Sequence, residues 1–197
     1  FVQASIRSGG KIVPLAQREE DTKFQSVFIA KTNSGIKSLA DMKGKQVSFG
    51  SQSSTSGHLM PRTFLLQANI DPEKDLKRVA YSGAHDATIA SVVSGKVDAA
   101  ALDITVWQKF VTENKVNTQD VNVFFTTPSY FNYNWSVHAD MPIQQREKIK
   151  AALLALNPAN PEHAEILKLN RATRYVSTSP ENYKGLESAA RSAGLLQ

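Results

Sequence analysis

The sequence contains no cysteine, which excludes disulfide bonds, zinc sites built from thiolates and cysteine nucleophiles. It has no apolar run approaching the roughly 18 residues that a membrane-spanning helix needs. It also lacks the G-x-S-x-G elbow, the Walker loop with its lysine and the G-x-G-x-x-G turn. The four histidines show no i, i+4 pairing and no acidic neighbour typical of a metal site. We therefore predict no enzyme activity, no catalytic residue, no metal site and no cofactor.

The composition is that of an ordinary globular protein. Apolar residues make up 41% of the 197 residues and charged residues 21%, enough for one large domain or two small lobes. The net charge of +5 is spread along the chain rather than gathered in the basic, aromatic-interleaved stripe of nucleic-acid binders. We expect no nucleic-acid partner. The charge indicates either a mild bias toward small anions or an ordinary solvated surface.

Short apolar segments alternate with helical ones through most of the chain. The pattern predicts strands at residues 26–31, 46–50, 77–81, 97–102 and 121–125, and helices at residues 57–69, 86–94 and 105–114. This alternation favours a mainly parallel sheet covered by helices on both faces. Near the start, residues 2–6 and 11–15 have strand-like composition, and the last third predicts helices at residues 141–156, 162–170 and beyond Ser179.

The stretch FGSQSSTSGHLMP, residues 49–61, gathers hydroxyl side chains between a predicted strand and a helix that begins near Gly57. In an α/β sheet such a loop lies at the carboxyl end of a strand, where ligands bind. The helix start adds unpaired N–H groups and the positive end of its dipole. Together they would form a neutral, donor-rich cradle for an oxyanion. On local sequence alone, the same residues serve equally well as ordinary turn and N-cap residues.

A second stretch, YSGAHDA at residues 81–87, again runs from a strand through a Ser-Gly turn into a helix, with His85 at the helix start. A nearby anion would favour the protonated form of this histidine, and the helix dipole would oppose it. Alternatively, His85 caps its own helix or packs at the surface. Two donor-rich turns at one sheet edge favour a joint site over two separate coincidences.

At these residues the sequence resembles the periplasmic substrate-binding proteins of phosphonate, phosphite and phosphate ABC transporters. The resemblance rests on SSTSGHLMP, YSGAHDA and GKVDAAALD in this order, and it extends over about residues 6–140. It implies an α/β, type II periplasmic binding protein fold with two lobes and a ligand in the cleft. It also implies a membrane permease as partner and a periplasmic, or membrane-tethered extracytoplasmic, location. By resemblance, the oxyanion is held by Ser54, Thr55, Ser56 and His85.

The sequence departs from this family at two positions. Family members that bind aminoalkyl phosphonates place carboxylates where this chain has Thr105 and Tyr133. Asp103, two residues before Thr105, is a candidate replacement on the same turn. We therefore expect a ligand without an ammonium group, bound near Thr105, Tyr133 and Asp103. Tyr130 and Trp135 could add a wall beside Tyr133, or could be core aromatics.

The resemblance also predicts the lobes. Lobe one would comprise residues 1–28 and 127–197, and lobe two residues 29–126. Because the family has further strand–helix units ahead of the residue aligned with Phe1, the first lobe is expected to be incomplete, with an open sheet edge. Such an edge favours self-association as a homodimer, which light scattering would detect. Two other functions stay open: a ligand-sensing module of a membrane receptor, and an enzyme acting on a phosphorylated small molecule.

Overall fold

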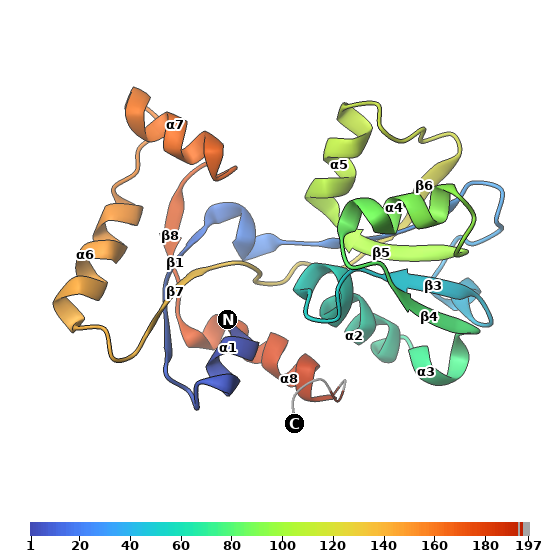
Figure 1. The fold of residues 1–197 in the computed structure, drawn as a ribbon, viewed down its shortest axis with the longest axis horizontal. Helices are drawn as coiled ribbons and strands as arrows, with labels where there is room; N and C mark the ends of the chain where they lie inside the picture. The colour runs from blue at the N-terminus through green and yellow to red at the C-terminus, as the bar shows by residue number, and fades with distance from the viewer. Residues whose placement is uncertain (193, 195–197) are drawn as a thin grey trace. The chain divides into compact units, whose positions relative to one another are not determined.

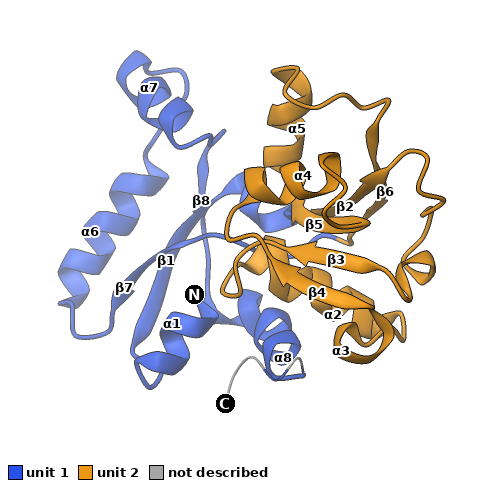
Figure 2. Ribbon diagram, turned by 45° about the vertical axis from the view of Figure 1, so that its right-hand side comes forward, with its two compact units in different colours: residues 1–24, 129–197 blue, residues 25–128 orange. Residues whose placement is uncertain are grey.

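The computed structural model describes residues 1–192 and 194, and the chain divides into two compact units. Unit 1 comprises Phe1–Phe24 and Ser129–Gln197, and unit 2 comprises Gln25–Pro128 (Figure 2). The lobes expected from the sequence, with boundaries after residues 28 and 126, stay a prediction. Strand β2 (Ser26–Lys31) pairs along its whole length within unit 2. Residues 193 and 195–197 of the predicted first lobe lie outside the described residues.

Unit 2 is built on a five-stranded sheet of mixed direction. Its strands, in spatial order, are β4 (Arg78–Tyr81), β3 (Gln46–Phe49), β5 (Ala99–Asp103), β2 and β6 (Val121–Thr126). Strand β3 runs parallel to β4 and β5, whereas β2 runs antiparallel to β5 and β6. The expected mainly parallel arrangement is thus corrected to a mixed one. Apolar strand patterns do not encode direction, which depends on pairing between distant segments.

Helices cover both faces of this sheet (Figure 1). On β2, Phe28 and Ala30 face one core and Val27 and Ile29 face the other, as the twofold strand period requires. The first core is closed by the turn η2 (Ala40–Met42), α2 (Met60–Gln67) and the segment around α3 (Pro72–Asp75). The second core is closed by α4 (His85–Val93) and α5 (Ile104–Thr112). Strands β2 and β5 are therefore buried on both faces, which explains their continuous apolar runs.

Strands β3, β4 and β5 end at one edge of this sheet, and side chains that bind a ligand can lie close together there. These three strands run in the same direction, so their carboxyl ends lie together. The start of β2 joins them, since Ser26 lies opposite Asp103 in the antiparallel register. The turns that follow β3 and β4 are the two donor-rich stretches of the sequence.

Unit 1 contains a three-stranded antiparallel sheet in the order β7 (Trp135–His138), β1 (Ile12–Arg18) and β8 (Tyr175–Ser177). Its helical elements are α1 (Val2–Arg7), η1 (Glu19–Lys23), α6 (Ile143–Leu154), α7 (Pro161–Leu169), η4 (Pro180–Tyr183) and α8 (Lys184–Ser192). Ala16, Leu167 and Tyr175 form a buried cluster that joins the sheet to the helices. Among the described residues, no helix combines the length and apolarity needed to span a bilayer.

The strand expected at residues 2–6 is a helix in the structure, and this expectation was wrong. The helix α1 buries Val2 and brings the Phe1 ring to 4.8 Å from the ring of Tyr183. Packing against a segment about 180 positions away thus outweighs the local strand propensity. The neighbouring strand, expected at residues 11–15, is present as β1.

Candidate functional site

The hydroxyl-rich loop after β3 folds into a helix start that opens with a π-turn, η3 (Thr55–Leu59), and continues as α2. Ser54 caps it: its Oγ accepts the N–H of Gly57 at 2.9 Å, and its carbonyl accepts the N–H groups of His58 and Leu59. This π-turn is a single turn of π-helix, a conformation that is rare and occurs frequently at functional sites. Because Oγ of Ser54 acts as an acceptor here, its own O–H proton remains available to a ligand.

Thr55 and Ser56 begin the π-turn, and the buried hydroxyl group of Ser56 has no hydrogen-bond partner among the described residues. The Ser56 side chain is the more telling, since the residue is only 1% exposed. Its carbonyl is occupied, because it accepts the hydroxyl of Ser26 at 2.7 Å. A buried hydroxyl without a partner is uncommon in folded proteins. It marks a donor that a bound anion can satisfy.

The second turn is fastened directly to the first. Ser82 donates its backbone N–H to the carbonyl of Phe49 at 3.0 Å, and its hydroxyl lies 2.6 Å from the Thr88 hydroxyl. The N–H of Gly83 reaches the carbonyl of Gly50 at 3.3 Å. These bonds hold the turn after β4 against the end of β3, with His85 as the first residue of α4. Ser82 therefore stabilises the position of this turn.

The two motifs meet at Gly57. A Cβ placed on Gly57 would lie 3.0 Å from Cε1 of His85 and 3.0 Å from Oγ of Ser54. Gly57 also packs on Gly50, whose N–H donates to its carbonyl at 2.8 Å. The His85 ring thus rests on the hydroxyl loop because this position lacks a side chain. The sequence located both turns but did not predict this contact, for which the STSG glycine was the available signal.

The ring of His85 is oriented by the end of β5. The backbone N–H of Asp103 donates to its Nδ1 at 3.5 Å, so in the neutral ring the proton lies on Nε2. Burial lowers the pKa of His85, and the carboxylates of Asp103 and Asp86 partly oppose that shift. The imidazole is therefore neutral at pH 7, with Nε2–H as a donor.

Asp103 and Thr105 form the start of α5. One carboxylate oxygen of Asp103 accepts the N–H of Thr105 at 2.6 Å, the hydroxyl of Thr105 at 2.7 Å and the N–H of Val106 at 3.3 Å. Asp103 is buried and acts as the helix N-cap. Both side chains thus have structural partners, and their contact with a ligand stays a prediction.

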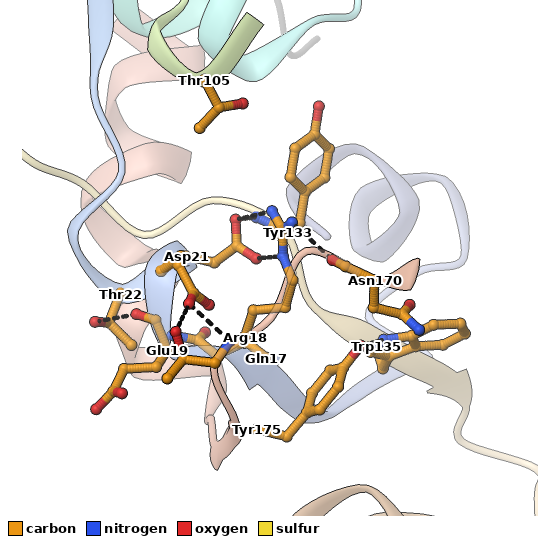
Figure 3. Close-up of polar contacts among 12 residues, drawn as sticks. Gln17, Arg18, Glu19, Asp21, Thr22, Thr105, Tyr133, Trp135, Asn170 and Tyr175 are labelled. Carbon is orange, nitrogen blue, oxygen red and sulfur yellow. Dashed lines mark hydrogen bonds and ion pairs between the residues drawn. The ribbon is translucent and has the colours of Figure 1, made fainter. Parts of the chain in front are cut away.

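Tyr133 lies in unit 1, beside an ion pair (Figure 3). Nε of Arg18 lies 2.6 Å from Oδ2 of Asp21, and the backbone N–H of Tyr133 donates to Oδ1 of Asp21 at 3.3 Å. Burial raises the pKa of Asp21, whereas its bonds to Arg18 lower it. The carboxylate beside Tyr133 is therefore neutralised by a guanidinium. Sequence reasoning missed this pair, although an arginine and an aspartate three residues apart at the end of a strand were visible.

The ion pair lines a cavity of about 370 Å³ within unit 1. Its lining residues are Arg18, Asp21, Tyr133, Asn134, Trp135, Asn170 and Tyr175. Tyr133 and Trp135 are half exposed, and Nε1 of Trp135 donates to the Tyr175 hydroxyl at 3.2 Å. Tyr130 is buried and packs on Phe24, so it is a core aromatic.

Acidification is expected to destabilise the protein, because burial lowers the pKa of both His58 and His85. A histidine with a lowered folded-state pKa binds fewer protons when folded, so its stabilising effect is complete above the unfolded pKa. That effect is lost as the pH falls from about 6.5 toward the folded-state pKa. Denaturant unfolding at about pH 7.5 and 5.5 measures the change. His85→Asn should show a shallower decline, and an identical decline would contradict this assignment.

The chain is similar to known proteins in sequence and in fold. A family model described as the periplasmic substrate-binding protein of phosphonate ABC transporters matches residues 1–183. The chain is 36% identical, over 201 aligned positions, to the probable ABC transporter phosphite binding protein PhnD1 of Prochlorococcus marinus (strain MIT 9301). That alignment covers 96% of this chain and 67% of PhnD1.

Two solved structures have folds similar to that of this chain. The structure of PhnD1 from Prochlorococcus marinus in complex with methylphosphonate matches with a TM-score of 0.88 and 34% identity, covering 98% of this chain and 75% of that one. A putative sulfonate-binding protein, SsuA from Methylobacillus flagellatus, matches with a TM-score of 0.66 at 16% identity, covering 98% and 65%. These neighbours confirm the predicted type II periplasmic binding protein fold.

Proposed function

The chain belongs to the family of periplasmic substrate-binding proteins of phosphonate ABC transporters, and we propose that it captures a tetrahedral phosphorus oxyanion at the two joined turns of unit 2. The observation that carries the proposal is the contact at Gly57, where the His85 ring rests against the Ser54 hydroxyl loop. This contact brings donors from two different strand ends to one place. The ligand oxygens would accept hydrogen bonds from Ser54, Thr55, Ser56 and His85.

The proposed site binds an anion with neutral donors. Hydroxyl groups and the Nε2–H of a neutral His85 donate without adding a fixed positive charge. Hydrogen bonds to a charged acceptor are stronger than those between neutral groups, so several such donors give useful affinity. A site without a buried cation also avoids leaving an unpaired charge when the ligand departs. This chemistry suits a protein that binds its ligand and then delivers it to a permease.

We expect the ligand to carry a small neutral substituent or none. The relative PhnD1 is described as phosphite binding and has been solved with methylphosphonate. In this chain Thr105 and Tyr133 replace the two ammonium-binding acids, and one carboxylate oxygen of Asp103 caps α5. Neither Thr105 nor Tyr133 offers a carboxylate to an ammonium. Phosphite, methylphosphonate and phosphate are therefore the proposed ligand class.

Calorimetric titration tests this proposal. The wild-type protein should bind at least one of phosphite, methylphosphonate and phosphate, and each bound ligand should compete better than 2-aminoethylphosphonate. Phosphorus NMR of the same samples should show no product, since relatives of this chain are binding proteins. A clear preference for 2-aminoethylphosphonate would overturn the ligand class and make Asp103 the candidate ammonium partner. Failure to bind any phosphorus oxyanion would overturn the site.

The family implies a membrane permease as the partner and the periplasm as the compartment. We propose that the loaded protein delivers its ligand to such a permease. The extent of the lobes and self-association as a homodimer stay predictions.

A further inference from the structure

His58 is a fully buried histidine directly beside the hydroxyl loop, and it has no assigned part in ligand binding. Its Nδ1 lies 2.8 Å from the carbonyl oxygen of Gln52, and its Nε2 lies 3.1 Å from the hydroxyl of Tyr81. Both ring nitrogens are therefore used. One contact reaches the loop that precedes the π-turn, and the other reaches the last residue of β4.

The chemistry of the two partners assigns the tautomer. A carbonyl oxygen can only accept, so Nδ1 must carry the proton that it shares with Gln52. In the neutral ring Nε2 then holds a lone pair and accepts the Tyr81 O–H. Burial lowers the pKa of His58, which favours this neutral form. The ring is thus a directed bridge in which Tyr81 donates to His58 and His58 donates to Gln52.

Two aromatic rings hold the bridge in place. The Phe49 ring lies 5.0 Å from the His58 ring, and the Tyr81 ring lies 4.9 Å away at an interplanar angle of 87°. Phe49 and Tyr81 are register partners at the ends of parallel strands β3 and β4. His58 therefore ties the loop to the same two strand ends that carry the second turn.

The tethered loop has few other supports. Within it, the N–H of Ser54 donates to the carbonyl of Ser51 at 3.0 Å, while Gln52 and Ser53 are exposed. An exposed segment must lose conformational freedom to present its hydroxyl groups together. The entropy cost of that loss weakens binding unless the ligand-free protein already holds the segment in this conformation. The hydrogen bond between the buried His58 ring and the Gln52 carbonyl restricts this segment in the ligand-free protein and so reduces that cost.

We propose that His58 is a positioning residue for the oxyanion site: its bridge from the Gln52 carbonyl to the Tyr81 hydroxyl holds the hydroxyl loop in binding shape before a ligand arrives. The inference rests on the proposed function and deepens it. It separates the residues proposed to contact the ligand, Ser54 to Ser56 and His85, from one that acts through them. A histidine that only filled the core would support folding without a specific effect on the loop.

Two substitutions test the bridge. His58→Phe keeps an aromatic ring but removes both nitrogens, whereas His58→Asn keeps a side-chain N–H close to the position of Nδ1. We expect His58→Phe to weaken methylphosphonate or phosphite binding about tenfold, since one anchoring hydrogen bond is lost. His58→Asn should recover most of that affinity. Tyr81→Phe, which removes only the hydroxyl, should have a smaller effect in the same direction.

A measurement without ligand separates this inference from the proposed function. Amide hydrogen exchange at residues 52–57 should become faster in His58→Phe than in wild type, and His58→Asn should restore protection. Exchange across the remaining helices and strands of unit 2 should change little. If the wild type binds no phosphorus oxyanion, the proposed function fails, while the exchange result still decides the role of His58.

Two outcomes would overturn the positioning role. One is wild-type affinity together with wild-type exchange at residues 52–57 in His58→Phe. The other is faster exchange throughout unit 2 with no excess at the loop, which is the mark of general destabilisation. If His58→Phe does not fold, Tyr81→Phe decides the same question. Unchanged affinity and unchanged loop exchange in that variant would then exclude the bridge.

Discussion

Replacing His85 with alanine is expected to weaken the binding of methylphosphonate or phosphite about tenfold to more than a hundredfold. The substitution removes the Nε2–H donor and its hydrogen bond to a charged oxygen, an interaction worth about 1.5–3 kcal/mol. Thr55→Ala should cost a similar amount, because Thr55 is the first residue of the π-turn and its hydroxyl is a proposed donor to the same charged oxygen atoms. Isothermal calorimetry gives both affinities under one set of conditions.

His138→Ala is the matched control for this experiment. His138 is exposed, lies in the edge strand β7 of unit 1 and pairs with Asp140 at 3.2 Å. Its removal should leave affinity for the oxyanion unchanged. If His85→Ala and Thr55→Ala both bind as tightly as wild type, the oxyanion site lies elsewhere in the protein.

Both turns of the proposed site could be found from the sequence because each follows a strong local pattern. A short apolar strand, a run of Ser and Gly and an amphipathic helix start are all encoded within about fifteen residues. The loop at residues 51–54 and the turn before His85 lie where this pattern places them. That parallel strands bring their carboxyl ends to one edge is a general rule, so the joint position could also be inferred.

Several contacts within the two units could not be predicted, because each depends on packing between segments distant in sequence. The bridge from His58 to Tyr81 spans 23 residues and requires β3 and β4 to be in register. The ion pair of Arg18 and Asp21 looks like a local surface pair in the sequence, yet it lies beside Tyr133, 112 residues after Asp21. Strand direction has the same origin, since the antiparallel pairing of β2 with β5 joins segments about 70 residues apart.

The second large effect is expected at Gly57. Alanine there places a methyl group 3.0 Å from Cε1 of His85 and 3.0 Å from Oγ of Ser54, closer than almost all real Cβ contacts. The ring and the capping hydroxyl must then move apart, and both are proposed ligand groups. We expect Gly57→Ala to weaken oxyanion binding about tenfold or more, and Gly57→Val to abolish measurable binding by calorimetry.

The stability of Gly57→Ala should fall less than its affinity for the oxyanion. This difference separates a defect in the site from a defect in folding. Gly57 lies in the π-turn, and alanine gains up to about 1 kcal/mol of helix propensity over glycine, which offsets part of the crowding. Gly185→Ala in α8 is the control, because a Cβ there meets nothing within 4 Å. It should leave affinity unchanged and raise or preserve the midpoint of denaturation.

The proposed role of the Gly57 contact would be contradicted if Gly57→Ala bound the oxyanion as tightly as Gly185→Ala and kept the His85 ring resonances of the wild type. Loss of binding at an unchanged denaturation midpoint would instead support a site that depends on the close approach of His85 to the hydroxyl loop.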